Sequence, residues 1–163
     1  MALPTVLIGL LCYAVLSRRG PLGGLELLYT SWGVVIGEFM LALPIVVTWT
    51  HGAIRNLDRR AGETALTLGA GPLRRWLTYL SETRLSIVLA LLTAFARCFT
   101  ELGIAMMVGG NIKYRTRTLA TATALETARG EFASGFAMSL ILLAMAMLIT
   151  AAIAWLGRAE KDK

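Results

Sequence analysis

Four long apolar segments dominate the chain, and their length predicts membrane-spanning helices. They cover Ala2–Leu16, Leu25–Thr50, Leu85–Val108 and Ala133–Leu156. A helix needs about 20 apolar residues to cross a bilayer, so the first segment is short and the other three are long enough. We therefore predict a single all-α domain over residues 1–163, a polytopic membrane helix bundle with about four spans.

A charged segment, Asp58–Arg84, separates the second apolar segment from the third and contains several glycines. Helical spacing of its apolar residues predicts a short helix over Leu57–Leu68. Gly69 and Gly71 are expected to end that helix, and Pro72 suits the first position of a second one. The apolar side chains that this pair of helices would offer for contact are Leu66, Leu68, Leu73, Trp76, Leu77 and Leu80. Taken alone, the segment is more typical of a solvated surface hairpin.

The composition agrees with a membrane protein and limits its partners. Hydrophobic residues make up 56% of the chain, against about 45–50% in an average soluble domain. The formal charge is +6, yet no nucleic-acid recognition motif accompanies it. In membrane proteins, basic residues mark cytoplasmic loops and bind anionic lipid head groups. We therefore expect membrane lipid, and no nucleic acid, as a partner.

The distribution of basic residues predicts the topology. The densest basic loop, which we take as residues 51–84, carries Arg55, Arg59, Arg60, Arg74, Arg75 and Arg84. The positive-inside rule places this loop in the cytoplasm, together with the basic tail after Leu156. The same count puts Arg18–Arg19 and the Lys113–Arg117 loop outside. Positive charge on the outer side is unusual for this rule.

Within the charged segment, the order of residues resembles a known motif. Glu63, Thr64 and Ala65, with Gly69 four positions later, are similar to the E-A-A-x-x-x-G loop of bacterial ABC-importer permeases, with Thr64 replacing one alanine. Further matches, strongest to tungstate-importer permeases among the oxyanion importers, are Gly20–Gly23, Leu43–Val46, Met106–Ile112 and Leu125–Phe132. The resemblance runs from about Leu3 to the last helix. We expect the N-terminal helix of the family to be missing from this chain.

This resemblance implies a multi-pass permease subunit in a bacterial or archaeal cytoplasmic (inner) membrane. Residues 51–84 would form the cytoplasmic coupling loop, whose helices sit in a groove of an ATPase subunit. The residues implied in this coupling are Glu63, Thr64, Ala65, Leu66, Leu68 and Gly69. Other implied partners are a periplasmic or lipid-anchored substrate-binding protein and a second permease copy. The chain has no G-x-x-x-x-G-K-[ST] phosphate loop, so we expect no enzyme activity and no cofactor in it, with ATP bound by the partner.

Polar residues inside and beside the apolar segments are candidates for the translocation pathway. Glu38, Arg97 and Glu101 lie within predicted spans, and intramembrane charges usually face the bundle interior. Arg97 and Glu101 are four residues apart, so they would also serve as a neutralised pair, together with Glu38, that holds the bundle together. The connector after the third segment adds further candidates, which are Gly109, Gly110, Asn111, Thr116, Arg117 and Thr118. An ordinary solvated connector is the alternative for these.

Other functions have little support in the sequence. His51 is the only histidine, and Cys12 and Cys98 show no metal-ligand spacing, so we expect no metal site and no catalytic residues. Two alternatives stay open beside tungstate import. One is a small structural or assembly membrane protein without transport, and the other is a permease for molybdate or sulfate.

Overall fold

The computed structural model describes residues 4–56, 69 and 71–161, with only the backbone described for 159–161. Its elements are α1 (Thr5–Leu16), the 3-10 turn η1 (Gly23–Leu25), α2 (Ser31–Arg55), α4 (Pro72–Glu82), α5 (Arg84–Phe99), α6 (Gly103–Gly109), α7 (Leu119–Ala128) and α8 (Phe132–Lys161). The described residues contain no strand. The predicted all-α class is therefore confirmed.

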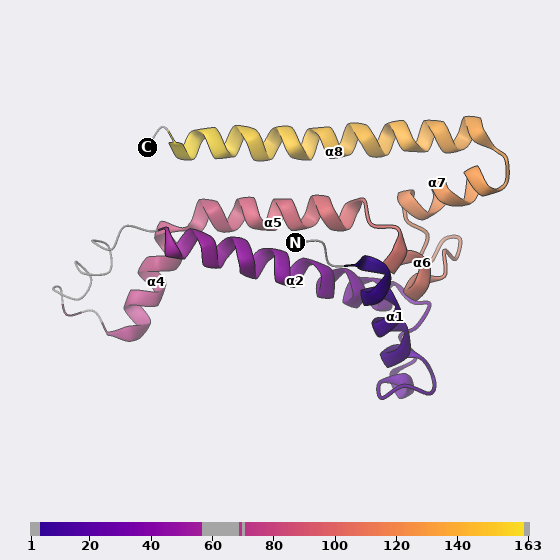
Figure 1. Ribbon diagram of the computed structural model, residues 1–163, viewed down its shortest axis with the longest axis horizontal. Coiled ribbons are helices and arrows are strands. Elements are labelled where there is room, and N and C mark those ends of the chain that lie inside the picture. Colours follow the sequence, from indigo (N-terminus) through magenta and orange to yellow (C-terminus); the bar gives the residue numbers. More distant parts are fainter. Residues whose placement is uncertain (1–3, 57–68, 70, 162–163) are drawn as a thin grey trace.

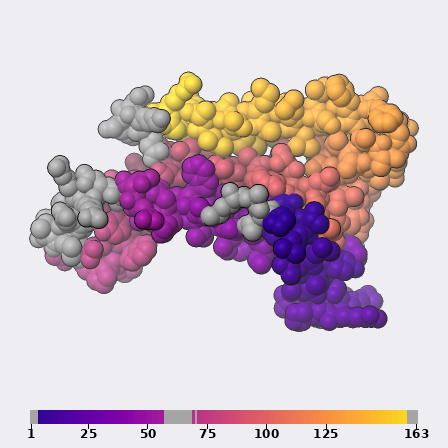
Figure 2. Space-filling model, viewed as in Figure 1, coloured from indigo at the N-terminus to yellow at the C-terminus, as the bar shows by residue number. Residues whose placement is uncertain are grey.

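The long helices lie side by side and the short ones gather at one end (Figure 1). α5 packs between α2 and α8, and α2 and α5 run in opposite directions. α1, α6 and α7 lie at the end where α2 begins, whereas α4 projects from the other end. Figure 2 shows α8 as a separate layer along one edge of the molecule. The bundle thus has two distinct ends, one formed by connectors and the other by α4.

Two helices are long and apolar enough to cross a membrane, namely Ser31–Arg55 and Phe132–Arg158. They correspond to the second and fourth apolar segments of the sequence. α4 and α5 would make a third span if taken together, although a bend of 63° separates them. α1 has 12 residues and is apolar but short, as predicted.

The third apolar segment is not one continuous helix, and that prediction was wrong. It breaks after Phe99 into α5 and the short α6. At the break, the Glu101 carboxylate accepts a hydrogen bond from the backbone N–H of Gly103 at 3.0 Å. This bond satisfies one of the N–H groups that a helix start leaves unpaired. Hydropathy alone does not reveal such a break, because both halves are apolar.

α6 forms the centre of the core because glycines let its neighbours approach closely. Ile104 and Val108 of α6 are fully buried between α1 and α2. On α2, a Cβ added at Gly37 would collide with Ile104, and one at Gly33 would lie 3.2 Å from Val108 Cγ1. Small residues four apart are a common way for membrane helices to pack backbone to backbone.

The predicted start of a helix at Pro72 is confirmed, because α4 begins there with Gly71 as its N-cap residue. Two other helix ends follow local rules of the same kind. Thr118 caps α7 by accepting a hydrogen bond from the N–H of Thr121. Gly110 ends α6 in the left-handed conformation, with φ of 69°.

The packing of α6 against α2 predicts that alanine at two glycines of α2 changes the stability of the protein in opposite directions. Gly37→Ala should lower the stability by about 1–3 kcal/mol, because the fully buried Ile104 leaves no room for the added methyl group. Gly52→Ala is the matched control: its Cβ would meet nothing within 4 Å, and alanine favours the helix by about 1 kcal/mol. Thermal unfolding in detergent micelles measures both. Equal effects of the two substitutions would contradict this packing.

Candidate functional site

Residues 51–56, 69 and 71–84 of the coupling loop are described, and the predicted helix over Leu57–Leu68 lies outside the described residues. Of the residues implied in ATPase coupling, Glu63, Thr64, Ala65, Leu66 and Leu68 lie outside the described residues. Gly69 is described and adopts a left-handed conformation with φ of 71°, which favours glycine. A left-handed Gly69 agrees with the predicted end of a helix at this position.

α4 presents an apolar stripe that the described bundle leaves uncovered. Leu73, Trp76, Leu77 and Leu80 follow one another at helical spacing, and their exposed fractions are 75%, 59%, 57% and 42%. The 63° bend against α5 directs α4 away from the long helices (Figure 1). A contiguous exposed apolar surface of this kind marks a site for a partner protein or for lipid.

The predicted charge pair inside the bundle is confirmed. Arg97 Nη1 lies 2.7 Å from Glu101 Oε2, and the Glu101 side chain is buried whereas that of Arg97 is 42% exposed. The other Glu101 oxygen binds the N–H of Gly103. Glu101 therefore joins α5 to the start of α6, as expected of a pair that holds the bundle together.

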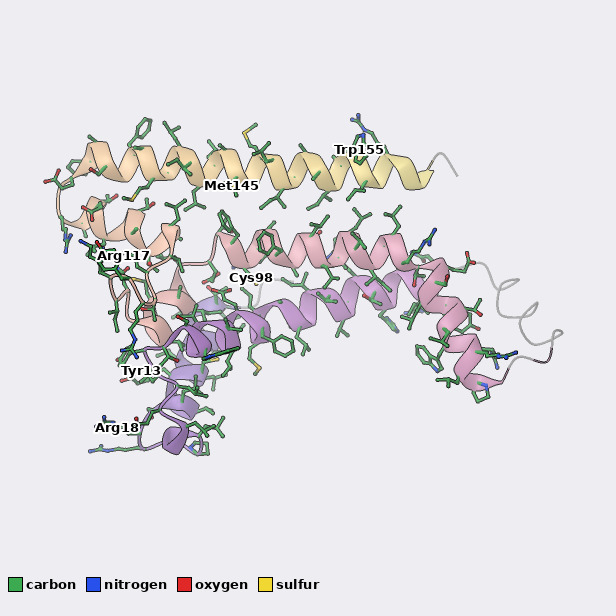
Figure 3. The ribbon with its side chains drawn as sticks, turned by 180° about the vertical axis from the view of Figure 1, so that it is seen from behind. Tyr13, Arg18, Cys98, Arg117, Met145 and Trp155 are labelled. Atoms are coloured by element: carbon green, nitrogen blue, oxygen red, sulfur yellow. The ribbon has the colours of Figure 1, made fainter. Side chains whose placement is uncertain are left out.

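Glu38 lies beside this pair without joining it. The Cys98 thiol donates a hydrogen bond of 3.5 Å to the backbone carbonyl of Glu38, and Figure 3 shows Cys98 between α5 and α2. Among the described residues, Glu38 forms no ion pair, and its Oε2 is buried without a hydrogen-bond partner. The expected three-residue network is thus reduced to Arg97 and Glu101, with Glu38 held nearby.

The connector residues that were candidates for an oxyanion site mainly bind one another. Thr116 Oγ1 donates to the carbonyl of Gly109 and accepts from the N–H of Ile112 at 2.9 Å. Arg117 Nε donates to Asn111 Oδ1 at 3.1 Å. These bonds form a tightly folded loop in which Thr116 is buried. A role of these residues in the pathway stays a prediction.

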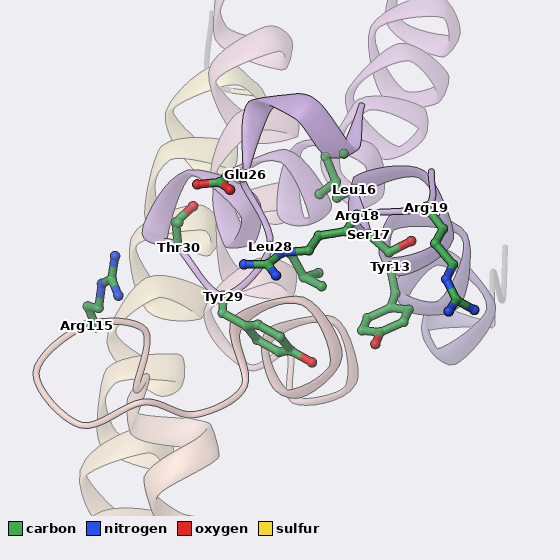
Figure 4. Close-up of a pocket in the computed structure, with 11 residues that line it drawn as sticks. Tyr13, Leu16, Ser17, Arg18, Arg19, Glu26, Leu28, Tyr29, Thr30 and Arg115 are labelled. Atoms are coloured by element: carbon green, nitrogen blue, oxygen red, sulfur yellow. The ribbon is translucent and has the colours of Figure 1, made fainter. Parts of the chain in front are cut away.

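A polar cavity at the connector end was not predicted as a unit. It has a volume of about 650 Å³, and its lining includes Tyr13, Arg18, Arg19, Tyr29 and Arg115 (Figure 4). The sequence placed the arginines in two separate outer loops, and the fold brings the loops together. The sequence signal for this cavity is the presence of basic residues in outer loops, where the positive-inside rule does not expect them.

Comparison with known proteins identifies the family. No family model matches the chain. The tungstate uptake system permease protein of Campylobacter jejuni is 42% identical over 149 residues, 91% of this chain. The chain spans 62% of that protein's length. The corresponding permease of Peptoclostridium acidaminophilum is 35% identical, over 94% of this chain and 67% of its own. A probable anion ABC transporter permease protein of Haloferax volcanii is 36% identical, over 100% of this chain and 71% of its own.

The chain belongs to the ABC transporter permease family. It is a membrane protein, and α2 and α8 are the two described helices that are long and apolar enough to cross the membrane on their own. Within this permease, α4 and the polar cavity lie at opposite ends of α2, since Thr30 lines the cavity and Arg55 ends the helix on the α4 side (Figure 1).

The double role of Glu101 in the permease predicts a graded response to substitution. Glu101→Ala removes the ion pair with Arg97 and the acceptor for Gly103, so we expect a stability loss of about 1–3 kcal/mol. Glu101→Gln keeps an acceptor oxygen and should cost less. The half-exposure of Arg97 limits the contribution of the ion pair itself.

The matched control for this series is Glu126→Gln, which breaks the exposed pair with Arg129 and should change the stability by less than about 1 kcal/mol. Thermal unfolding of the purified permease in detergent ranks the three variants. An Ala variant no less stable than the Gln variant would show that the bond to Gly103 does not support the helix break.

Proposed function

We propose that this permease is the transmembrane subunit of an ATP-driven importer for an oxyanion, and that the oxyanion is tungstate. The observation that carries the proposal is the 42% identity to a tungstate uptake permease over nearly the whole chain. A separate binding protein delivers the anion at the outer side, and the importer works in the cytoplasmic (inner) membrane.

In this proposal, ATP hydrolysis by a partner subunit drives the permease through its α4 end. The sequence holds no phosphate-binding loop, so a partner ATPase subunit binds and hydrolyses ATP, and the permease itself carries no cofactor. The exposed stripe of α4 follows directly after the segment with the Glu63–Gly69 motif. An apolar helix face beside a basic cytoplasmic loop fits a groove on a partner subunit, where it would transmit movement into α5.

Two copies of the permease form the pathway in this account. The most apolar 18-residue window of α8 has no buried residue, although α8 packs along α5 and α7. Its remaining surface is apolar, as expected for a helix that faces lipid and a second copy. A movement of the two copies against each other would open the pathway alternately to either side.

Uptake by intact cells tests the function. Cells without their own tungstate uptake, supplied with the permease, its ATPase and its binding protein, should accumulate tungsten, measured by mass spectrometry. Gly69→Pro should abolish uptake, because proline requires a φ near −65° and Gly69 has +71°. Glu63→Ala should abolish it as well, through the coupling role that the motif implies. Gly52→Ala is the control, and immunoblots of membranes should show equal amounts of all forms.

The outcomes separate the alternatives. Normal uptake in both coupling variants would contradict the role of the loop. Accumulation of molybdenum or sulfate in place of tungsten would mean that the chain is an importer permease for molybdate or sulfate. Absence of uptake for all three oxyanions would favour the structural or assembly protein.

A further inference from the structure

The cavity at the connector end collects positive charge from distant parts of the chain. Arg18 and Arg19 follow α1, and Arg115 comes from the connector between α6 and α7. Glu26 is the one carboxylate among the residues that line the cavity, so three guanidinium groups against one carboxylate leave a formal charge of +2. Figure 4 shows Arg18 reaching into the cavity towards Leu28 and Tyr29, with Arg115 and Arg19 at opposite sides.

The guanidinium groups are the hydrogen-bond donors that the cavity offers to an anion. Among the described residues, none of the ion pairs or side-chain hydrogen bonds involves the guanidinium of Arg18, Arg19 or Arg115. By contrast, the serine and threonine hydroxyls of the cavity already donate to backbone carbonyls. Ser17 Oγ donates to the Ala14 carbonyl at 3.2 Å, and Thr30 Oγ1 donates to the Leu27 carbonyl at 2.6 Å. An anion in the cavity would therefore meet arginine rather than serine or threonine.

The backbone around the cavity is held in place by specific contacts. Tyr29 has φ of 62°, a left-handed conformation that is uncommon for residues other than glycine. Its N–H donates to the Val108 carbonyl at 2.9 Å, and its ring lies where a Cβ of Gly110 would be, 2.6 Å from Cδ1. Ser31 Oγ donates to the Arg115 carbonyl at 2.9 Å and so fixes the connector to the start of α2. Residues held in such energetically unfavourable backbone conformations often occur at functional sites.

Two tyrosines complete one wall of the cavity. The side chain of Tyr13, together with burial, raises the pKa of the Tyr29 hydroxyl above its ordinary value. Tyr29 therefore stays neutral at physiological pH and does not add negative charge beside Arg18.

The cavity lies on the outer side of the membrane in the predicted topology. α2 begins at the cavity with Ser31 and ends with Arg55, next to the basic loop assigned to the cytoplasm. Arginines are normally scarce in outer loops, since the positive-inside rule opposes them. Their convergence here, in one cavity, indicates a function that requires positive charge.

We propose that this cavity is an outer vestibule that collects the hydrated oxyanion before it enters the bundle. The inference rests on the proposed function for the direction of transport and the kind of anion. A volume of about 650 Å³ is far larger than a bare tetrahedral anion, since one water occupies about 30 Å³. The anion thus keeps its hydration shell, and attraction by the arginines raises its local concentration without holding it tightly.

The rate of chemical modification at individual arginines shows whether an anion occupies this vestibule. Phenylglyoxal is added to the full-length permease in phosphatidylcholine nanodiscs, without ATPase or binding protein, and the modified sites are counted by peptide mass spectrometry. Tungstate should slow the modification of Arg18 and Arg115 several-fold. Arg129 is the internal control, because it lies outside the cavity lining on α7's C-terminal side and should be unaffected.

Substitutions then test whether the arginines share one anion. Arg18→Gln should remove most of the protection of Arg115, whereas Arg18→Lys should retain it, because lysine keeps the charge. Both variants change an exposed side chain, and circular dichroism should show unchanged helix content. Protection should also weaken as salt rises above about 0.15 M, because the Debye length shortens.

Three results would overturn the vestibule. The first is equal modification of Arg18 and Arg115 with and without tungstate. The second is equal protection by chloride at the same ionic strength, which would mean general screening. The third, in a separate reaction that contains the binding protein and no tungstate, is protection of Arg18 and Arg115, which would make the cavity a docking site for protein. None of these measurements requires transport, so failure of the vestibule is distinct from failure of the uptake assay.

Discussion

The close approach of α2 to α6 is the constraint on which the rest of the permease depends. Gly33 and Gly37 provide the space into which Val108 and Ile104 pack, and α1 closes the other side with Gly9 against Met107. Because α6 is only seven residues long, it cannot be stable by itself and takes its position from these neighbours. Its two ends then place the polar features. Glu101 lies at its start, and the Val108 carbonyl at its end holds Tyr29 of the outer cavity.

This arrangement explains how a small bundle carries charge in an apolar environment. Glu101 is buried, yet both of its oxygens are used, one by Arg97 and the other by the N–H of Gly103. A carboxylate without such partners is costly at membrane depth. Glu38 is the exception, since its Oε2 is buried without a hydrogen-bond partner among the described residues. Basic residues also gather at the two ends, with the arginines of the vestibule at one and Arg55, Arg74 and Arg75 at the other. In our account, anion capture and ATP coupling are therefore separated by the length of α2.

The sequence predicted the class of the fold, the long apolar helices α2 and α8 and the start of α4, because hydropathy and Pro72 are local signals. It predicted the pairing of Arg97 with Glu101 from their spacing. It did not predict the break between α5 and α6, since a buried carboxylate that binds the N–H of Gly103 leaves no mark in the hydropathy. Nor did it predict the cavity, whose arginines come from residues 18 and 115 and meet only through packing around α6.

Co-purification tests the central claim that this chain is a permease driven through its α4 end. The tagged chain is isolated from its native membrane with mild detergent, and the proteins that accompany it are identified by mass spectrometry. We expect an ATPase subunit to accompany the unaltered chain and to be lost with Trp76→Ala, which truncates the largest side chain of the exposed α4 stripe. Gly52→Ala, on α2, should retain it. Recovery of the chain without an ATPase, or equal recovery of the ATPase with Trp76→Ala, would contradict the account.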